Sequence, residues 1–227
     1  MKDKYRLEKK FLVRSLESEH LEDILSLLPF NFIEIFAERA VNNIYFDTPY
    51  LSNYFDNIDG NFLKRKTRIR WYGDLFGPID KPKLEIKGKK GQFGTKDFFT
   101  LPNFTLKKGV NRNHIIQILQ SSEYGKQARI KGLIPTLLNT YKRKYFLSAD
   151  KLFRFTVDRD LSYYSLNSRT YNFLDKADDN QSVVLELKYD RKYEEIAEVI
   201  TNRLPFRMTK SSKYIMGIER VVTHHQL

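Results

Sequence analysis

The chain has 227 residues, and its 40 lysines and arginines outnumber 28 aspartates and glutamates, which gives a formal net charge of +12. This excess favours an anionic partner without naming it. The absence of cysteine excludes disulfides, thiolate metal sites and a cysteine nucleophile, and it fits a reducing cytoplasm. The length suits a single β domain over residues 1–227.

No segment resembles a membrane span or a secretion signal. Residues 1–10 are charged and lack an apolar core, and no stretch approaches the roughly 20 apolar residues that cross a bilayer. We therefore expect a cytoplasmic protein, whose membrane association would be peripheral to the inner face or through another protein.

Strands are predicted where aromatic or β-branched residues lie between turn formers. In chain order they span residues 5–13, 42–47, 64–72, 83–89, 97–101, 140–148, 152–160, 182–190 and 214–220. Helical spacing of apolar residues predicts helices at 16–28 and 193–204, with weaker patterns at 48–56 and 113–120. This order predicts an α+β fold with an antiparallel sheet.

Charged residues recur at alternate positions of these strands, so they share one face while apolar residues take the other. The charged rows are Arg6, Glu8 and Lys10; Lys66, Arg68 and Arg70; Glu85, Lys87 and Lys89; Arg154, Thr156, Asp158 and Asp160; and Glu186 with Lys188. Tyr141, Arg143 and Tyr145 form a less regular sixth row.

An ordinary sheet with one solvated face would account for any single row. The density of cations, and three copies of Glu-x-Lys at 8–10, 85–87 and 186–188, favour one shared site. If the charged face turns inward, the sheet forms an antiparallel closed β-barrel, a tunnel of about eight or nine strands with helices packed outside. Its cations would repel one another, so we expect a slim polyanion inside rather than a nucleic-acid duplex.

Several short motifs occur in a specific order. They are RLEKK at residues 6–10, YFDT at 45–48, RIR at 68–70, LEIK at 84–87, YKR at 141–143, RFTVD at 154–158, LELK at 185–188 and KSSKY at 210–214. Together, and over nearly the whole chain, they resemble the polyphosphate polymerase domain of the vacuolar transporter chaperone (VTC) family, within the triphosphate tunnel metalloenzymes, also called CYTH-like.

The resemblance implies an enzyme that transfers the γ-phosphate of ATP to a growing polyphosphate chain, with Mn²⁺ or Mg²⁺ as cofactor. The residues expected in catalysis are Lys10, Arg70, Lys87 and Glu186. Those expected to bind phosphate or substrate are Arg6, Lys66, Arg68, Lys89, Arg143, Arg154, Lys188, Lys210, Ser212 and Lys213. Glu186 is the expected metal carboxylate, and Glu8 and Glu85 would bind metal as well or orient neighbouring cations.

The expected ligands are ATP, polyphosphate and pyrophosphate, with no nucleic acid. A separate membrane protein is a further expected partner, because the regulatory and membrane segments of the eukaryotic relatives are missing from this sequence.

Two positions depart from the pattern of the relatives. Arg6 stands where hydrolytic tunnel enzymes have a glutamate, which favours polyanion binding over attack by water. Lys210 stands where an arginine is common, and lysine does not make the planar bidentate contact.

Other functions stay open at this point. They are an inorganic or nucleoside triphosphatase, an adenylate cyclase, and a non-catalytic polyphosphate- or RNA-binding module. An RNA-binding module would need aromatic side chains beside the cations, whereas most aromatic residues of the predicted strands fall opposite them.

Overall fold

The computed structural model describes residues 6–14, 20–61, 63–90, 93–109, 112–121, 130, 132–166 and 176–221. Within these ranges the side chains of residues 6, 63, 89, 90 and 93–95 are not described. The chain divides into two compact units. The first unit consists of residues 1–39, 141–161 and 179–211, and the second of residues 40–140, 162–178 and 212–227.

The fold is α+β, as predicted. The strands are β1 (Arg6–Arg14), β2 (Ile33–Asp47), β3 (Leu63–Tyr72), β4 (Gly77–Ile79), β5 (Lys83–Lys90), β6 (Phe93–Thr100), β7 (Phe104–Leu106), β8 (Ile134–Leu147), β9 (Arg154–Ser165), β10 (Lys176–Asp179) and β11 (Ser182–Asp190). The helices are α2 (Leu21–Leu27), α3 (Ser52–Ile58), α4 (Arg112–Gln120), the 3₁₀ turn η2 (Arg191–Tyr193), α5 (Glu194–Thr201) and α6 (Lys213–Val221). Among the described residues, no helix has the length and apolar character needed to cross a membrane.

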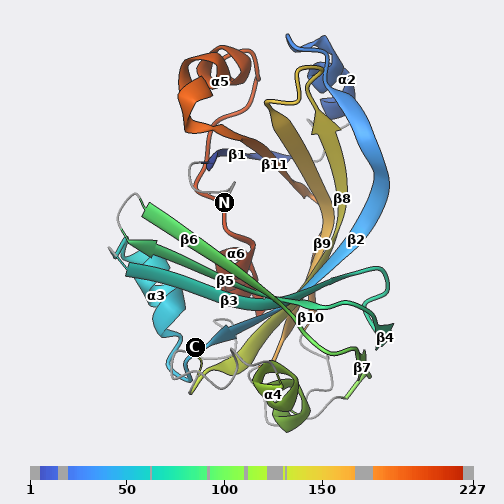
Figure 1. Cartoon of the computed structure of the whole chain (residues 1–227), viewed down its shortest axis with the longest axis vertical. Helices are drawn as coiled ribbons and strands as arrows, with labels where there is room; N and C mark the ends of the chain where they lie inside the picture. The colour runs from blue at the N-terminus through green and yellow to red at the C-terminus, as the bar shows by residue number, and fades with distance from the viewer. Residues whose placement is uncertain are drawn as a thin grey trace. The chain divides into compact units, whose positions relative to one another are not determined.

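The large sheet follows the order β1-β11-β9-β8-β2-β3-β5-β6, with β10 paired to β9 (Figure 1). Strands β4 and β7 form a separate two-stranded sheet. Strands β2, β8 and β9 each contribute residues to both units.

The predicted closed barrel is wrong for the described part of the chain, where neither sheet closes on itself. Closure would require the end strands β1 and β6 to pair with each other. Instead, the free side of β1 is used by a later segment of its own unit. Met208 forms an antiparallel bridge with Phe11, and the Thr209 amide donates to the Lys10 carbonyl at 2.7 Å. The other end strand, β6, carries Lys96 and Asp97, and charged side chains on an edge strand disfavour further pairing.

The core of the first unit lies on the apolar face of β1, β11 and β9. Phe11, Leu185 and Phe155 occupy neighbouring strands and pack with helices α2 and α5, which contribute Leu25 and Ile200. Burying these side chains also fixes the strand register, since a shift of one residue would turn the charged residues into the core.

The second unit has an equivalent arrangement on β3 and β5. Ile69, Trp71 and Leu84 are buried there and pack with Ile115 and Leu119 of α4. In both units a helix therefore covers the apolar face of the strands, as predicted, and the charged side chains take the opposite face.

One predicted strand is a helix in the structure. Residues 214–220 include Tyr214, Ile215 and Ile218, whose residue types favour a strand, but they belong to α6. Tyr214, Gly217, Ile218 and Val221 are the buried residues of that helix, and their spacing has the helical period. The predicted strand at 182–190 has the same bounds as β11, and the other predicted strands are present with shifted ends. Strands β4, β7 and β10 were not predicted.

Candidate functional site

The first unit carries a set of charged and polar side chains that we call the first charged face. It consists of Glu8 and Lys10 on β1, Glu186 and Lys188 on β11, Arg154, Thr156 and Asp158 on β9, and Arg143 on β8. Strand pairing sets the rows of this face, because Glu8 lies opposite Lys188 and Lys10 lies opposite Glu186. On the next strand Thr156 lies opposite Glu186.

Glu186 lies at the centre of the first charged face and is only 6% exposed. Its carboxylate forms ion pairs with Lys188 and, at 3.8 Å, with Lys10. Burial favours the neutral acid, but Lys188, Lys10 and Arg143 together hold the pKa of Glu186 well below its usual range. Lys10 also forms an ion pair with Glu8, at 3.2 Å on the same strand. Because Glu8 lies opposite Lys188 and Lys10 opposite Glu186, positive and negative charges alternate across β1 and β11.

Arg143 is fixed by a buried carboxylate on the neighbouring strand. Its Nε and Nη2 donate to the two oxygens of Asp158 at 2.5 and 2.7 Å. Burial alone would disfavour the charged guanidinium, but Asp158 raises the pKa of Arg143 further above its ordinary value. Arg143 also lies over the rings of Tyr141 and Tyr145, with distances of 5.2 and 5.8 Å to their centroids. This arginine is therefore held as a permanent, oriented cation.

Arg154 differs from Arg143 in its hydrogen bonding. Its Nε is buried and has no hydrogen-bond partner among the described residues. Strand pairing places Arg154 opposite Lys188, so two cations lie side by side across β9 and β11. Like charges in this position are destabilising, and a bound anion would relieve the repulsion.

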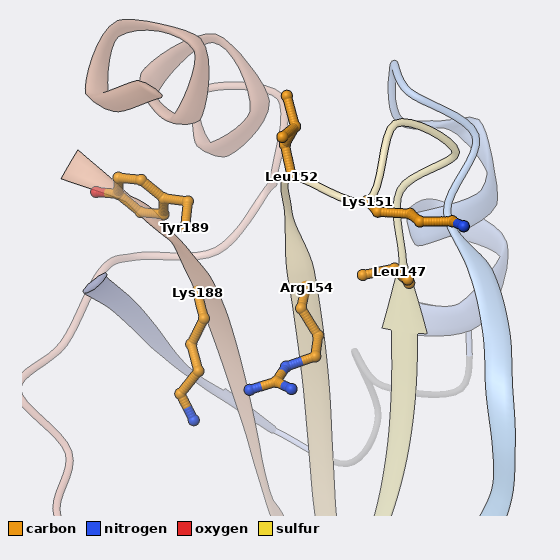
Figure 2. A pocket seen from close by; sticks show the side chains of 6 residues that line it. All are labelled: Leu147, Lys151, Leu152, Arg154, Lys188 and Tyr189. Atoms are coloured by element: carbon orange, nitrogen blue, oxygen red, sulfur yellow. The ribbon is translucent and has the colours of Figure 1, made fainter. Parts of the chain in front are cut away.

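A small pocket of about 80 Å³ adjoins this pair of cations. It is lined by Leu147, Lys151, Leu152, Arg154, Lys188 and Tyr189. In Figure 2 the side chains of Arg154 and Lys188 extend to the same side of their strands, while the ammonium group of Lys151 points away from them. The pocket thus combines an apolar wall with two cations.

The second unit carries a second charged face on four strands that are neighbours in the large sheet. It consists of Asn43 and Tyr45 on β2, Lys66, Arg68 and Arg70 on β3, Lys83, Glu85 and Lys87 on β5, and Lys96, Phe98 and Thr100 on β6. Figure 1 shows β3, β5 and β6 side by side. The register makes a regular grid of these side chains.

One row of this grid holds Tyr45, Arg68, Glu85 and Phe98 in neighbouring positions. Arg68 donates from Nε and Nη2 to Oε2 of Glu85 at 2.8 and 2.5 Å, and from Nη1 to the Tyr45 hydroxyl at 3.1 Å. Arg70 approaches the other oxygen of Glu85 at 3.5 Å. Burial raises the pKa of Glu85, but Arg68, Arg70 and Lys96 outweigh it and lower the pKa to about 2. Glu85 therefore orients two arginines.

A second row consists of three lysines in register. Lys66 lies opposite Lys87, and Lys87 lies opposite Lys96 on the next strand. Lys66 Nζ also donates to Ser212 Oγ at 2.9 Å, just before α6 begins at Lys213. This concentration of positive charge is suited to a ligand with several anionic groups.

A buried network around Asp47 fixes the start of α6. Asp47 accepts hydrogen bonds from the backbone amides of Thr48, Asn53 and Tyr54 and, at 2.5 Å, from the hydroxyl of Tyr214. Burial raises the pKa of Tyr214, and Asp47 raises it further, so the phenol stays protonated. The Tyr214 ring lies 5.2 Å from that of Tyr45, which connects the network to Arg68.

The structure brings together several of the predicted site residues, within one unit or the other. The first unit holds Glu8, Lys10, Arg143, Arg154, Glu186 and Lys188, and the second holds Lys66, Arg68, Arg70, Glu85, Lys87, Ser212 and Lys213. Two Glu-x-Lys copies, at residues 8–10 and 186–188, are paired across β1 and β11, whereas the third belongs to the second unit. Lys210 is exposed, and the side chains of Arg6 and Lys89 lie outside the described part.

The sequence analysis did not single out all the polar residues that support these faces. It missed Asn43, which accepts from Arg70 at 2.8 Å, and the acceptor role of Asp47. Asp158 was placed on the charged face but not paired with Arg143. A useful signal for such residues is a buried strand position that holds Asn or Asp, because a buried polar group needs a partner.

The described residues contain no group of three or more His, Asp or Glu side chains close enough to hold a metal ion. Mg²⁺ is often bound by only one or two carboxylates together with substrate phosphates, and the same oxygen ligands suit Mn²⁺. Glu8 and Glu186, on adjacent strands, fit that kind of site. Glu85 is instead bonded to Arg68.

Several solved structures share this fold. The PH1819 protein from Pyrococcus horikoshii OT3 is 13% identical, with a TM-score of 0.53 over 95% of this chain and 99% of that one. A putative adenylate cyclase from Vibrio parahaemolyticus is 12% identical, with a TM-score of 0.55 and the same coverage of both chains. At such identities the likeness concerns the fold alone.

The family itself is established by sequence. The family model of the VTC domain matches residues 5–222. The chain therefore belongs to the VTC domain family, which confirms the resemblance noted from its motifs. No curated protein sequence matches it.

Proposed function

We propose that this protein is a metal-dependent phosphotransferase that uses ATP to extend polyphosphate. In this reaction a terminal oxygen of the polyphosphate chain forms a bond to the γ-phosphorus of ATP. The bond from that phosphorus to the β–γ bridging oxygen breaks, and ADP leaves. The chain gains one phosphate for each ATP consumed.

The observation that carries the proposal is the pairing of like charges across neighbouring strands. Lys66, Lys87 and Lys96 form one cationic row in the second unit, and Arg154 lies opposite Lys188 in the first. A sheet surface exposed only to water gains nothing from such an arrangement. A polyanion with a charge on every phosphate compensates it at every position, and membership of the VTC domain family supports this choice of ligand.

The residues proposed for catalysis contribute charge and position. Phosphoryl transfer needs little covalent chemistry from the protein, so oriented cations supply much of the stabilisation. In the second unit Arg70 is held by Asn43, and it would bind a phosphate group in a fixed orientation. Lys87 lies two rows further along the sheet, opposite Lys66, and would supply charge to another phosphate of the chain. In the first unit Lys10 would do the same next to Glu186.

A divalent ion fits Glu186, with Glu8 as the second carboxylate. When bound, Mg²⁺ or Mn²⁺ would neutralise charge on the phosphate oxygens. Glu186 is already ionised because of the cations around it, so it can bind a metal without losing a proton at neutral pH. Lys188 and Lys10 would then turn towards phosphate.

The proposal is tested by incubating the protein with ATP and Mn²⁺ and following the products by phosphorus NMR. We expect ADP and signals of internal phosphoanhydride groups. Arg70→Ala and Lys87→Ala should each abolish these signals while leaving the far-UV circular dichroism unchanged, because neither side chain supports a core. Growth of inorganic phosphate alone would identify a hydrolase, and a cyclic nucleotide with pyrophosphate would identify a cyclase.

A further inference from the structure

Phe98 is an exception to the separation of aromatic and charged side chains. Its neighbour Phe99 packs against the core of the second unit, as expected for alternation along β6. Phe98 therefore lies on the opposite side, on the second charged face, where it pairs with Glu85 in register. It is 46% exposed, although a phenyl ring gains free energy from burial.

The surroundings of Phe98 combine an aromatic surface with phosphate-binding charge. The ammonium nitrogen of Lys96 lies 4.1 Å from the centroid of the Phe98 ring. Lys96 also ends the row formed with Lys66 and Lys87. The two side chains are two residues apart on one strand, about 6.8 Å along its axis, a distance that a ribose can span between a base and its 5′-phosphate.

A ring face that attracts a cation is also a stacking surface. Lys96 is exposed and has a long flexible side chain, so its ammonium group can move to a phosphate while a planar base takes its place on the ring. Base stacking on an aromatic side chain accepts any base, because every base has a π face. An isolated exposed phenylalanine would need no explanation, but this one adjoins a row of three lysines.

We propose that Phe98 is the stacking platform for the base of the nucleotide donor, with Lys96 and Lys87 binding its phosphates. This inference rests on the proposed function in one respect, namely that the donor is a nucleoside triphosphate rather than inorganic polyphosphate. A platform at Phe98 would distinguish the nucleotide donor from the polyphosphate chain, because polyphosphate has no base to stack on the phenyl ring.

Isothermal titration with two probes tests the inference. One probe is the non-hydrolysable β,γ-imido analogue of ATP, and the other is inorganic tripolyphosphate, which has the same number of phosphates without a base. Phe98→Ala should weaken binding of the ATP analogue at least about fivefold, the lower end of what one stacked base contributes. Binding of tripolyphosphate should change less than twofold. Phe98→Trp should restore binding of the ATP analogue, because tryptophan stacks at least as well.

Phe55→Ala serves as the matched control, because Phe55 is an equally exposed phenylalanine of the same unit, on α3. It should alter neither titration. Unchanged binding of the ATP analogue by Phe98→Ala, or an equal loss for both probes, would overturn the inference. If wild-type protein then still makes polyphosphate, the proposed function survives that result. If Phe98 governs binding of the ATP analogue but no polyphosphate forms, the proposed function fails and the platform stands.

Discussion

Glu85 makes the stability of the second charged face depend on pH. Its pKa is lowered from the ordinary 4.5 to about 2 by Arg68, Arg70 and Lys96. A lowered pKa contributes stability above pH 4.5 that is lost as the pH falls towards 2. At neutral pH the contribution to the free energy of unfolding is about 3 kcal/mol.

Urea unfolding of wild type and Glu85→Gln between pH 7 and pH 2.5 measures this contribution. Wild type should be the more stable at pH 7, and the difference between the two proteins should shrink steadily below about pH 4.5. A difference that is the same at every pH would mean that Glu85 acts through packing rather than charge.

Arg154 and Lys151 offer a matched pair on the pocket of the first unit. Both line the pocket, but only Arg154 extends to the same side as Lys188 (Figure 2). Arg154→Ala would remove the proposed charge-assisted contact to a phosphate, which is worth roughly 1.5–3 kcal/mol, so tripolyphosphate should bind about tenfold more weakly or worse. Lys151→Ala lowers the net charge equally and should weaken binding less than threefold.

Titration calorimetry at low salt distinguishes these variants. An equal loss for Arg154→Ala and Lys151→Ala would indicate that the protein attracts anions through its net charge and has no defined site at Arg154. Urea unfolding of both variants checks that neither result arises from a damaged fold.

At the scale of single elements, α6 tests how closely the second unit is packed. A Cβ at Gly217 would lie 2.5 Å from Leu137 Cδ2 and 2.6 Å from Tyr163 Cδ1. Both side chains are fully buried and have little room to move. Overpacking of this kind costs roughly 1–3 kcal/mol, more than the roughly 1 kcal/mol that alanine gains over glycine in a helix.

Gly217→Ala should therefore lower the midpoint of urea unfolding, although alanine is the better helix former. A raised midpoint would show that Leu137 and Tyr163 adapt readily and that α6 is only loosely packed against β8 and β9.

The alternation of charged and apolar residues was enough to predict most strands and the side of each strand that faces the core. Residues 64–72 and 182–190 are examples, because in each segment charged and apolar residues occupy alternate positions. Residues 214–220 were assigned to a strand because residue preference was weighed above spacing. Tyr214 and Ile218 are four apart, and both are buried on one side of α6.

At the scale of the whole molecule, the sequence predicted the family but not how the sheet ends. Closure depends on which edges meet, and a short edge contact such as Phe11 with Met208 leaves no trace in the residue pattern. The partners that orient the arginines were also hard to predict. Asp158 and Asn43 reach them from neighbouring strands, so their roles follow from register alone.

We propose that the charged faces bind a phosphate chain and are not solvated surfaces. The most direct measurement is the melting temperature in increasing concentrations of tripolyphosphate at low salt, with sulfate as the reference anion. A ligand that binds only the folded state adds about 2.7 kcal/mol at one hundred times its dissociation constant. We predict a clear rise that saturates with tripolyphosphate and a smaller rise with sulfate, whereas a melting temperature indifferent to tripolyphosphate would contradict the claim.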